Sequence, residues 1–144
     1  MGIFDVAERE WEEWRPGTWS RMWTSELTGS EEGRTGEQYH AIGIGAPRHT
    51  HPYEEHLLVD QGRAEVYYGD ETHVLDAPFS VIIPAGVVHG FTNIGFEPLH
   101  LYVAISQNTL EAVFIDEPDL VTKEYEQSTG GIRYVENIKD DTAT

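Results

Sequence analysis

The feature that most constrains the fold is a regular series of turn signals through the middle of the chain. Between residues 37 and 106, five clusters of turn-forming residues interrupt runs of β-favouring residues at intervals of about ten residues. The clusters are Asp60-Gln61-Gly62, Gly69-Asp70-Glu71, Asp76-Ala77-Pro78, Pro84-Ala85-Gly86 and Asn93-Ile94-Gly95. No helix-length periodic stretch interrupts this series. The pattern predicts an all-β domain, built as an antiparallel sandwich or a small barrel.

The N-terminal segment has a different texture. Apolar residues recur there at spacings of three and four, which predicts a short helix ended by Pro16-Gly17; they are Phe4, Ala7, Trp11 and Trp14. Residues 19–24 alternate as a strand would, and residues 29–36 are predicted to be a polar loop.

The C-terminal segment is less regular. Residues 109–115 fit either a helix or a strand, and the polar residues 136–144 are expected to fray. We therefore divide the chain into an N-terminal segment (1–36), a central β-domain (37–106) and a C-terminal extension (107–144).

Composition restricts the partners of this single domain of 144 residues. The net charge is -17, from 26 acidic and 9 basic residues, which argues against nucleic acid and anionic membranes as partners. The first six residues do not resemble a signal peptide, and no apolar run approaches the ~20 residues of a membrane span, so we expect a cytoplasmic protein. The chain has no cysteine, which leaves any metal site to histidine and carboxylate ligands.

Histidine and glutamate residues crowd one short segment. In an extended strand, His49, His51 and Glu55 would point to one face, and Glu54 and His56 to the other. The first three residues are therefore candidate ligands of one metal ion, with Glu55 preferred over Glu54.

Two further features bear on this site. Pro52 cannot donate to a sheet ladder, so it predicts an edge, a bulge or a bend within the segment. His89 follows the Pro84-Ala85-Gly86 turn on another strand, which we expect to pack across the barrel from the first three ligands. Three imidazoles and one carboxylate suit Fe(II), Mn(II), Ni(II), Co(II) or Zn(II). An octahedral ion held this way keeps two positions open for a substrate, or for a substrate and O₂.

The spacing of these residues resembles that of a known family. The pattern Gly43-x5-His49-x-His51-x3-Glu55-x6-Gly62 is similar to the first motif of the cupin superfamily. The pattern Pro84-x-Gly86-x2-His89-x3-Asn93 is similar to the second motif, although Pro78 stands where that motif opens with glycine.

The resemblance implies a small single-domain cupin: one jelly-roll β-barrel with a short N-terminal helix and terminal extensions. It also implies one divalent transition metal (Fe, Mn, Ni, Co or Zn), held by His49, His51, Glu55 and His89. Small cupins are often homodimers paired through their N-terminal strands, so we expect a homodimer with contacts from the N-terminal segment.

The expected function is that of a metal-dependent enzyme acting on a small oxygenated molecule. Dioxygenase chemistry is the first hypothesis, with Glu55 as ligand and base. A non-oxidative isomerase, epimerase, decarboxylase or lyase is the second, with His100 or Tyr102 moving a proton. A small-ligand-binding protein without turnover is the third. Arg48, beside the first ligand, is a candidate for holding an anionic substrate.

The strand that carries His100 and Tyr102 presents two alternating sets of residues. One set is His100 and Tyr102; the other is Leu99, Leu101 and Val103. The aliphatic set is the more natural core, and a catalytic role for the polar pair requires the opposite orientation.

Overall fold

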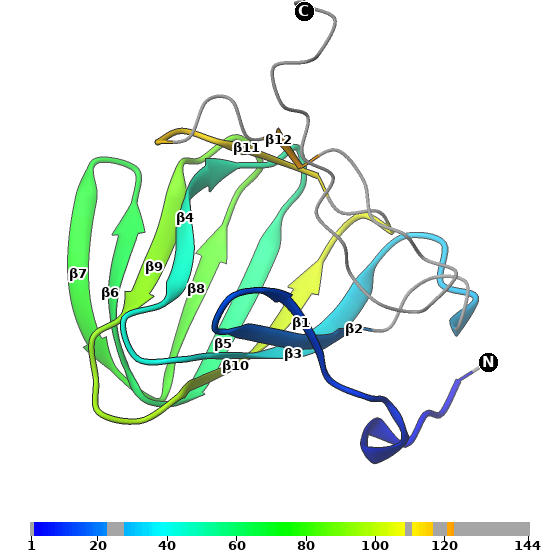
Figure 1. The fold of residues 1–144 in the computed structure, drawn as a ribbon. Helices are drawn as coiled ribbons and strands as arrows, with labels where there is room; N and C mark the ends of the chain where they lie inside the picture. The colour runs from blue at the N-terminus through cyan, green and yellow to red at the C-terminus, as the bar shows by residue number, and fades with distance from the viewer. Residues whose placement is uncertain (1, 23–27, 109–110, 117–120, 123–144) are drawn as a thin grey trace, which may run out of the picture.

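The computed structural model describes residues 2–22, 28–108, 111–116 and 121–122, and it shows two antiparallel sheets (Figure 1). The first sheet has the order β1 (Glu12–Arg15), β2 (Thr18–Met22), β3 (Arg34–His40), β10 (Leu99–Ile105), β5 (Glu55–Gln61) and β8 (Phe79–Ile83). The second has the order β12 (Val121–Thr122), β11 (Ala112–Phe114), β4 (Gly45–Thr50), β9 (His89–Asn93), β6 (Arg63–Tyr68) and β7 (Glu71–Asp76). The prediction of an all-β fold is confirmed. Among the described residues, strand pairing defines two sheets and no closed barrel.

The core lies between the two sheets and explains the alternating pattern of the strands. In β5, Leu57 and Val59 are buried, whereas Leu58 between them is 47% exposed on the outer face. The buried hydrophobic cluster draws on both sheets: Tyr53, Leu57, Val59, Ala64, Val66, Ile83, Phe91, Leu99, Leu101, Val103 and Ile105. Each of these strands therefore presents one face to the core, which is the period-two pattern of a packed sheet.

The register of β10 positions side chains across the first sheet. Strand β10 pairs with β3 on one side and β5 on the other. Its residue Ile105 lies opposite Arg34 in β3 and opposite Glu55 in β5. Residues directly opposite one another in antiparallel strands share a face. Because Ile105 belongs to the core, Arg34 and Glu55 point toward the interior with it.

The predicted N-terminal helix is wrong. Where the helix was predicted, the structure has the 3-10 turn η1 (Val6–Glu8) and then β1, which pairs with β2 through a tight turn at Gly17. Gly17 has a φ of 80°, a conformation that glycine adopts without strain. The rings of Trp11 and Tyr39 lie 5.0 Å apart, so Trp11 packs on the sheet. Pairing with an existing sheet outweighs the marginal stability of a short isolated helix.

Other segments follow the predictions in part. The predicted loop 29–36 is three residues too long, because β3 begins at Arg34. Within 109–115, the strand alternative is confirmed for β11. Residues 23–24, 109–110 and 136–144 lie outside the described residues. No helix in the described part of the chain is long and apolar enough to cross a membrane. The cytoplasmic location stays a prediction.

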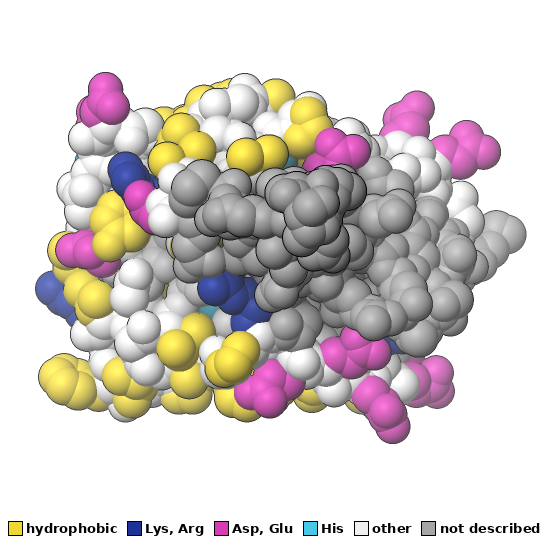
Figure 2. All heavy atoms as spheres, turned by 45° about the horizontal axis from the view of Figure 1, so that its top comes forward, with side chains coloured by type: hydrophobic (Ala, Val, Ile, Leu, Met, Phe, Trp, Pro, Cys, Tyr) yellow, Lys and Arg dark blue, Asp and Glu magenta, His cyan; other side chains and the backbone are white. Residues whose placement is uncertain are grey.

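Figure 2 shows how charge is distributed on one face of the molecule. Asp and Glu side chains stand around the outline of this face, whereas a group of Arg side chains lies near its centre. Among the described residues on this face, the acidic side chains therefore lie mainly toward its outline.

Burial of His40 makes the stability of the fold depend on pH. His40 is 1% exposed, its Nε2 is 2.9 Å from Gln38 Oε1, and burial together with the nearby Arg15 charge lowers its pKa to about 3. The unfolded chain therefore takes up a proton below pH 6.5 that the folded chain does not, and stability falls as the pH drops. We expect His40 to contribute a loss of about 2 kcal/mol between pH 7.5 and 5.0.

Urea unfolding at both pH values measures this loss. His40→Gln should lose less stability than the wild type over the same interval, because the substituted side chain does not titrate. An equal loss in both proteins would contradict the assignment to His40.

Candidate metal centre

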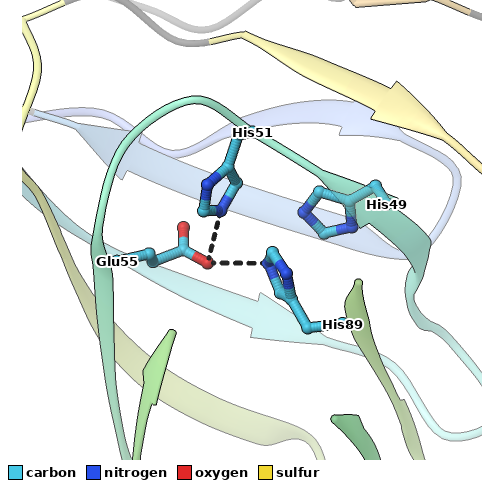
Figure 3. Close-up of side chains that lie close together, drawn as sticks. All are labelled: His49, His51, Glu55 and His89. Carbon is cyan, nitrogen blue, oxygen red and sulfur yellow. Dashed lines mark hydrogen bonds and ion pairs between the residues drawn. The ribbon is translucent and has the colours of Figure 1, made fainter. Parts of the chain in front are cut away.

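The four predicted ligands converge at one end of the interior, from both sheets. His49 lies near the end of β4 and is opposite His89, the first residue of β9. Glu55 is the first residue of β5 in the other sheet, and His51 lies in the connection between β4 and β5. One potential ligand atom from each of these residues lies within 4.8 Å of the others (Figure 3).

Two details of the predicted geometry are wrong. His49, His51 and Glu55 do not lie on one strand, because the chain leaves β4 after Thr50 and bends at Pro52 before entering the other sheet. The bend is one of the alternatives that Pro52 predicted. His89 is a direct neighbour of His49 in the same sheet and does not face it across the interior.

A turn from the second motif holds the two halves of the site together. The backbone N–H of Gly86 donates to the carbonyl of His51 at 2.9 Å. Gly86 has a φ of 83°, which suits glycine at this turn. The turn therefore holds the backbone of the ligand His51, and the next ligand, His89, follows three residues after Gly86.

Backbone carbonyls orient all three imidazoles. Nδ1 of His49 is 2.7 Å from the carbonyl oxygen of Pro47, and Nδ1 of His51 is 2.9 Å from that of Tyr53. Nδ1 of His89 is 2.9 Å from the carbonyl oxygen of Val87. Because a carbonyl only accepts, each Nδ1 carries the hydrogen. The neutral ring then has its lone pair on Nε2, the tautomer that binds metal through Nε2.

With this tautomer, the Nε2 atoms of the three imidazoles and the carboxylate of Glu55 all present lone pairs to one point. Oε1 of Glu55 is 3.3 Å from Nε2 of His51 and 3.3 Å from Nε2 of His89. His89 is 2% exposed, yet its Nε2 makes no hydrogen bond among the described residues. A buried polar atom without a partner is costly, and a cation bound at this point would satisfy all four residues. The donor set fits a divalent transition metal.

The protonation states also suit a metal. Burial lowers the pKa of His49 to about 3, and the neighbouring His89 adds to this effect, so His49 is neutral. Metal ligands must be deprotonated in this way, so little free energy is spent on removing protons when an ion binds.

Two aromatic rings that the sequence reasoning missed pack beside the ligands. The Tyr53 ring stacks on His51 at 4.2 Å, and its hydroxyl donates to the carbonyl of Glu111 at 3.1 Å. The Phe114 ring lies 5.4 Å from that of His49. Tyr53 stands between two ligands in the first motif, and this position was the available signal. Nothing in the sequence pointed to Phe114.

The other predicted site residues lie elsewhere. Leu99, Leu101 and Val103 face the core, so His100 and Tyr102 lie on the outer face of the first sheet. His100 is buried there, with Nε2 2.6 Å from Glu37 Oε2 and Nδ1 2.5 Å from Asp60 Oδ1. Tyr102 is 45% exposed. This placement gives no support for a role of His100 or Tyr102 at the metal centre.

Arg48 is also directed away from the ligands. It precedes His49 in β4 and so points to the opposite face of the strand. Its guanidinium binds Asp116 through two hydrogen bonds of 2.6 and 2.9 Å, and this pair is exposed. Arg48 is therefore engaged on the surface.

Comparison with known proteins agrees with the geometry. The profile of the cupin domain matches residues 37–105. The chain is 32% identical to polyketide synthase CurC of Streptomyces cyaneus over 105 residues. This alignment covers 72% of this chain and 68% of CurC. The chain belongs to the cupin superfamily.

Solved cupin structures share the fold at low sequence identity. KdgF from Halomonas sp. superposes with a TM-score of 0.64 at 17% identity, over 74% of this cupin and 94% of KdgF. The polyketide cyclase RemF from Streptomyces resistomycificus superposes with a TM-score of 0.62 at 19% identity, over 73% of this cupin and 78% of RemF.

Metal content provides the first test of the site. Protein purified without chelator should hold about one transition-metal ion per chain, and His51→Ala or His89→Ala should lower the affinity at least tenfold, because a ligand is lost. Elemental analysis after dialysis against a graded chelator measures this. His56→Ala is the matched control, because the His56 side chain is 52% exposed and pairs with Glu54 on the surface. Equal metal retention by all variants would contradict the assignment.

Proposed function

We propose that this cupin is a metal-dependent enzyme that acts on a small polycarbonyl substrate by non-oxidative chemistry at an enolate. The observation that carries the proposal is the convergence of three imidazole lone pairs and one carboxylate in a buried site. A divalent ion held by these residues supplies Lewis-acid stabilisation to carbonyl and enolate oxygens.

The names of two similar proteins support the choice of substrate. CurC is called a polyketide synthase and RemF a polyketide cyclase. Polyketide chains carry 1,3-dicarbonyl groups, which chelate metal ions through two oxygens once they are enolised. The ligand set of this cupin suits such chelation, because four protein ligands leave two positions of an octahedral ion for the substrate.

The residues of the site have different proposed roles. Glu55 supplies the one carboxylate of this cluster, so we assign it as the base that takes a proton from the substrate. In Figure 3, dashed lines join one carboxylate oxygen of Glu55, Oε1, to the rings of His51 and His89. The second carboxylate oxygen points away from His89. We assign the proton taken from the substrate to that second oxygen. Tyr53 and Phe114, packed on His51 and His49, shield this end of the interior from water.

Dioxygenation of the same substrate class is the second candidate. The observation that favours it is the mixed donor set of histidines and one carboxylate, which also suits Fe(II) and leaves positions for both a substrate and O₂.

Product mass and oxygen consumption separate the candidates. Metal-loaded protein is incubated with 1,3-diketones, catechols, flavonols and small keto acids, and monitored with an oxygen electrode and mass spectrometry. We expect a dicarbonyl substrate to give a product of equal mass, or of that mass less one water, without oxygen uptake. His51→Ala should lose the activity and His56→Ala should keep it.

The other outcomes are equally informative. Uptake of one O₂ per turnover would contradict the non-oxidative proposal and support dioxygenation. Saturable binding without product after prolonged incubation would indicate a ligand-binding cupin without turnover.

We also propose that the protein is a homodimer that pairs through the outer face of the first sheet. A groove of about 570 Å³ runs over this face. Its lining includes Leu58, Ile82 and Tyr102, which are 47%, 46% and 45% exposed. Phe4 and Val6 of the N-terminal segment border it. An apolar surface of this kind is typical of an interface between subunits.

Light scattering tests the dimer. The wild-type protein should elute with twice the 16.3 kDa mass of the chain, and Leu58→Asp should shift it toward the monomer. Val74→Asp, at a 48% exposed position in β7 of the other sheet, should leave the mass unchanged. A wild-type monomer at all accessible concentrations would contradict the proposal.

A further inference from the structure

A small buried cavity lies between the two sheets, on the core side of the metal centre. It is lined by the ligand His89 and by residues of the hydrophobic core. Its volume is about 10 Å³, which is roughly the room that one water molecule occupies. Because the core residues around it are apolar, they offer a water molecule no hydrogen bonds, and the cavity suits an apolar group of similar size.

The strand register places this cavity next to the ligands in both sheets. In β5, Leu57 follows the ligand Glu55 by two residues and shares its face, and Val81 of β8 lies opposite Leu57. In β9, Phe91 follows the ligand His89 by two residues and shares its face. Leu57, Val81 and Phe91 all line the cavity. One step from the ligands toward the core therefore leads to its walls.

The packing around the cavity limits what can enter it. Leu57 and Phe91 are buried members of the hydrophobic core, and Val81 packs against that core. Protein interiors are packed as densely as organic crystals, so a group larger than the cavity must displace side chains, which is destabilising. A methyl group is close in size to a water molecule and fits, whereas an ethyl group does not.

We propose that Leu57 and Val81 limit the size of the substrate, because they leave room for no more than a methyl group on the core side of its dicarbonyl unit. This inference rests on the proposed function and narrows its substrate class to 1,3-dicarbonyl compounds with a methyl ketone at one end. When such a unit chelates an ion through both oxygens, its two substituents diverge. One points toward the cavity and is limited in size; the other points away from it and is not.

Three linear diketones that differ only in their end groups test this limit. Pentane-2,4-dione has two methyl ends, hexane-2,4-dione has one methyl and one ethyl end, and heptane-3,5-dione has two ethyl ends. Binding of each to the Zn(II)-loaded full chain is measured by calorimetry. We expect the first two to bind within about threefold of each other and the third to bind roughly tenfold or more weakly, because neither of its ends fits without displacing core side chains.

Variants that enlarge the cavity assign the effect to its walls. Leu57→Ala should bring the affinity for heptane-3,5-dione to within about threefold of that for pentane-2,4-dione, because the removed atoms leave space beside the ligands. Its metal content should stay unchanged. Val81→Ala, a smaller change opposite Leu57, should recover part of the affinity. Leu101→Ala is the matched control, because Leu101 is completely buried in the same core but is not among the residues that line the cavity; it should keep the tenfold difference.

The outcomes separate this inference from the proposed function. Equal binding of the three diketones by the wild type, or undiminished discrimination by Leu57→Ala, would overturn the size limit and leave the metal-dependent function standing. If protein that retains its metal binds none of the three, the dicarbonyl substrate is contradicted, and this inference with it. Should Leu57→Ala fail to fold, Val81→Ala decides the matter, since an unchanged difference in that variant would contradict the assignment to these walls.

Discussion

The constraint on which the site depends is the convergence of four metal-ligating side chains, three imidazoles and one carboxylate, at one buried point. Nδ1 of each imidazole is hydrogen-bonded to a backbone carbonyl, which directs the Nε2 lone pair into the cluster. Such an arrangement is unfavourable unless a cation is present. Two features of the fold enforce it: the pairing of His49 with His89 in one sheet, and the Gly86 to His51 hydrogen bond that joins the two motifs.

The residues of the site could be predicted from the sequence, but their arrangement could not. The spacing of His49, His51, Glu55 and His89 identified four residues that do lie together. The alternation rule predicted that His49, His51 and Glu55 share one face of a single strand, whereas the chain passes to the other sheet near Pro52. The alternation of side chains between two faces applies only within one continuous strand. It does not show where a strand ends or where the chain passes into the other sheet. Ligand identity therefore came from the motif, and geometry only from the structure.

Misassignments elsewhere have a similar physical origin. The spacing from Phe4 to Trp14 fits a helix, but β1 gains hydrogen bonds from β2 that no local pattern reveals. His100 and Tyr102 alternate with aliphatic residues along their strand, so only one of the two sets can face the core. The aliphatic set occupies that place, and His100 is buried on the other face between two carboxylates. Local periodicity predicts that one face is inside; packing decides what covers the other.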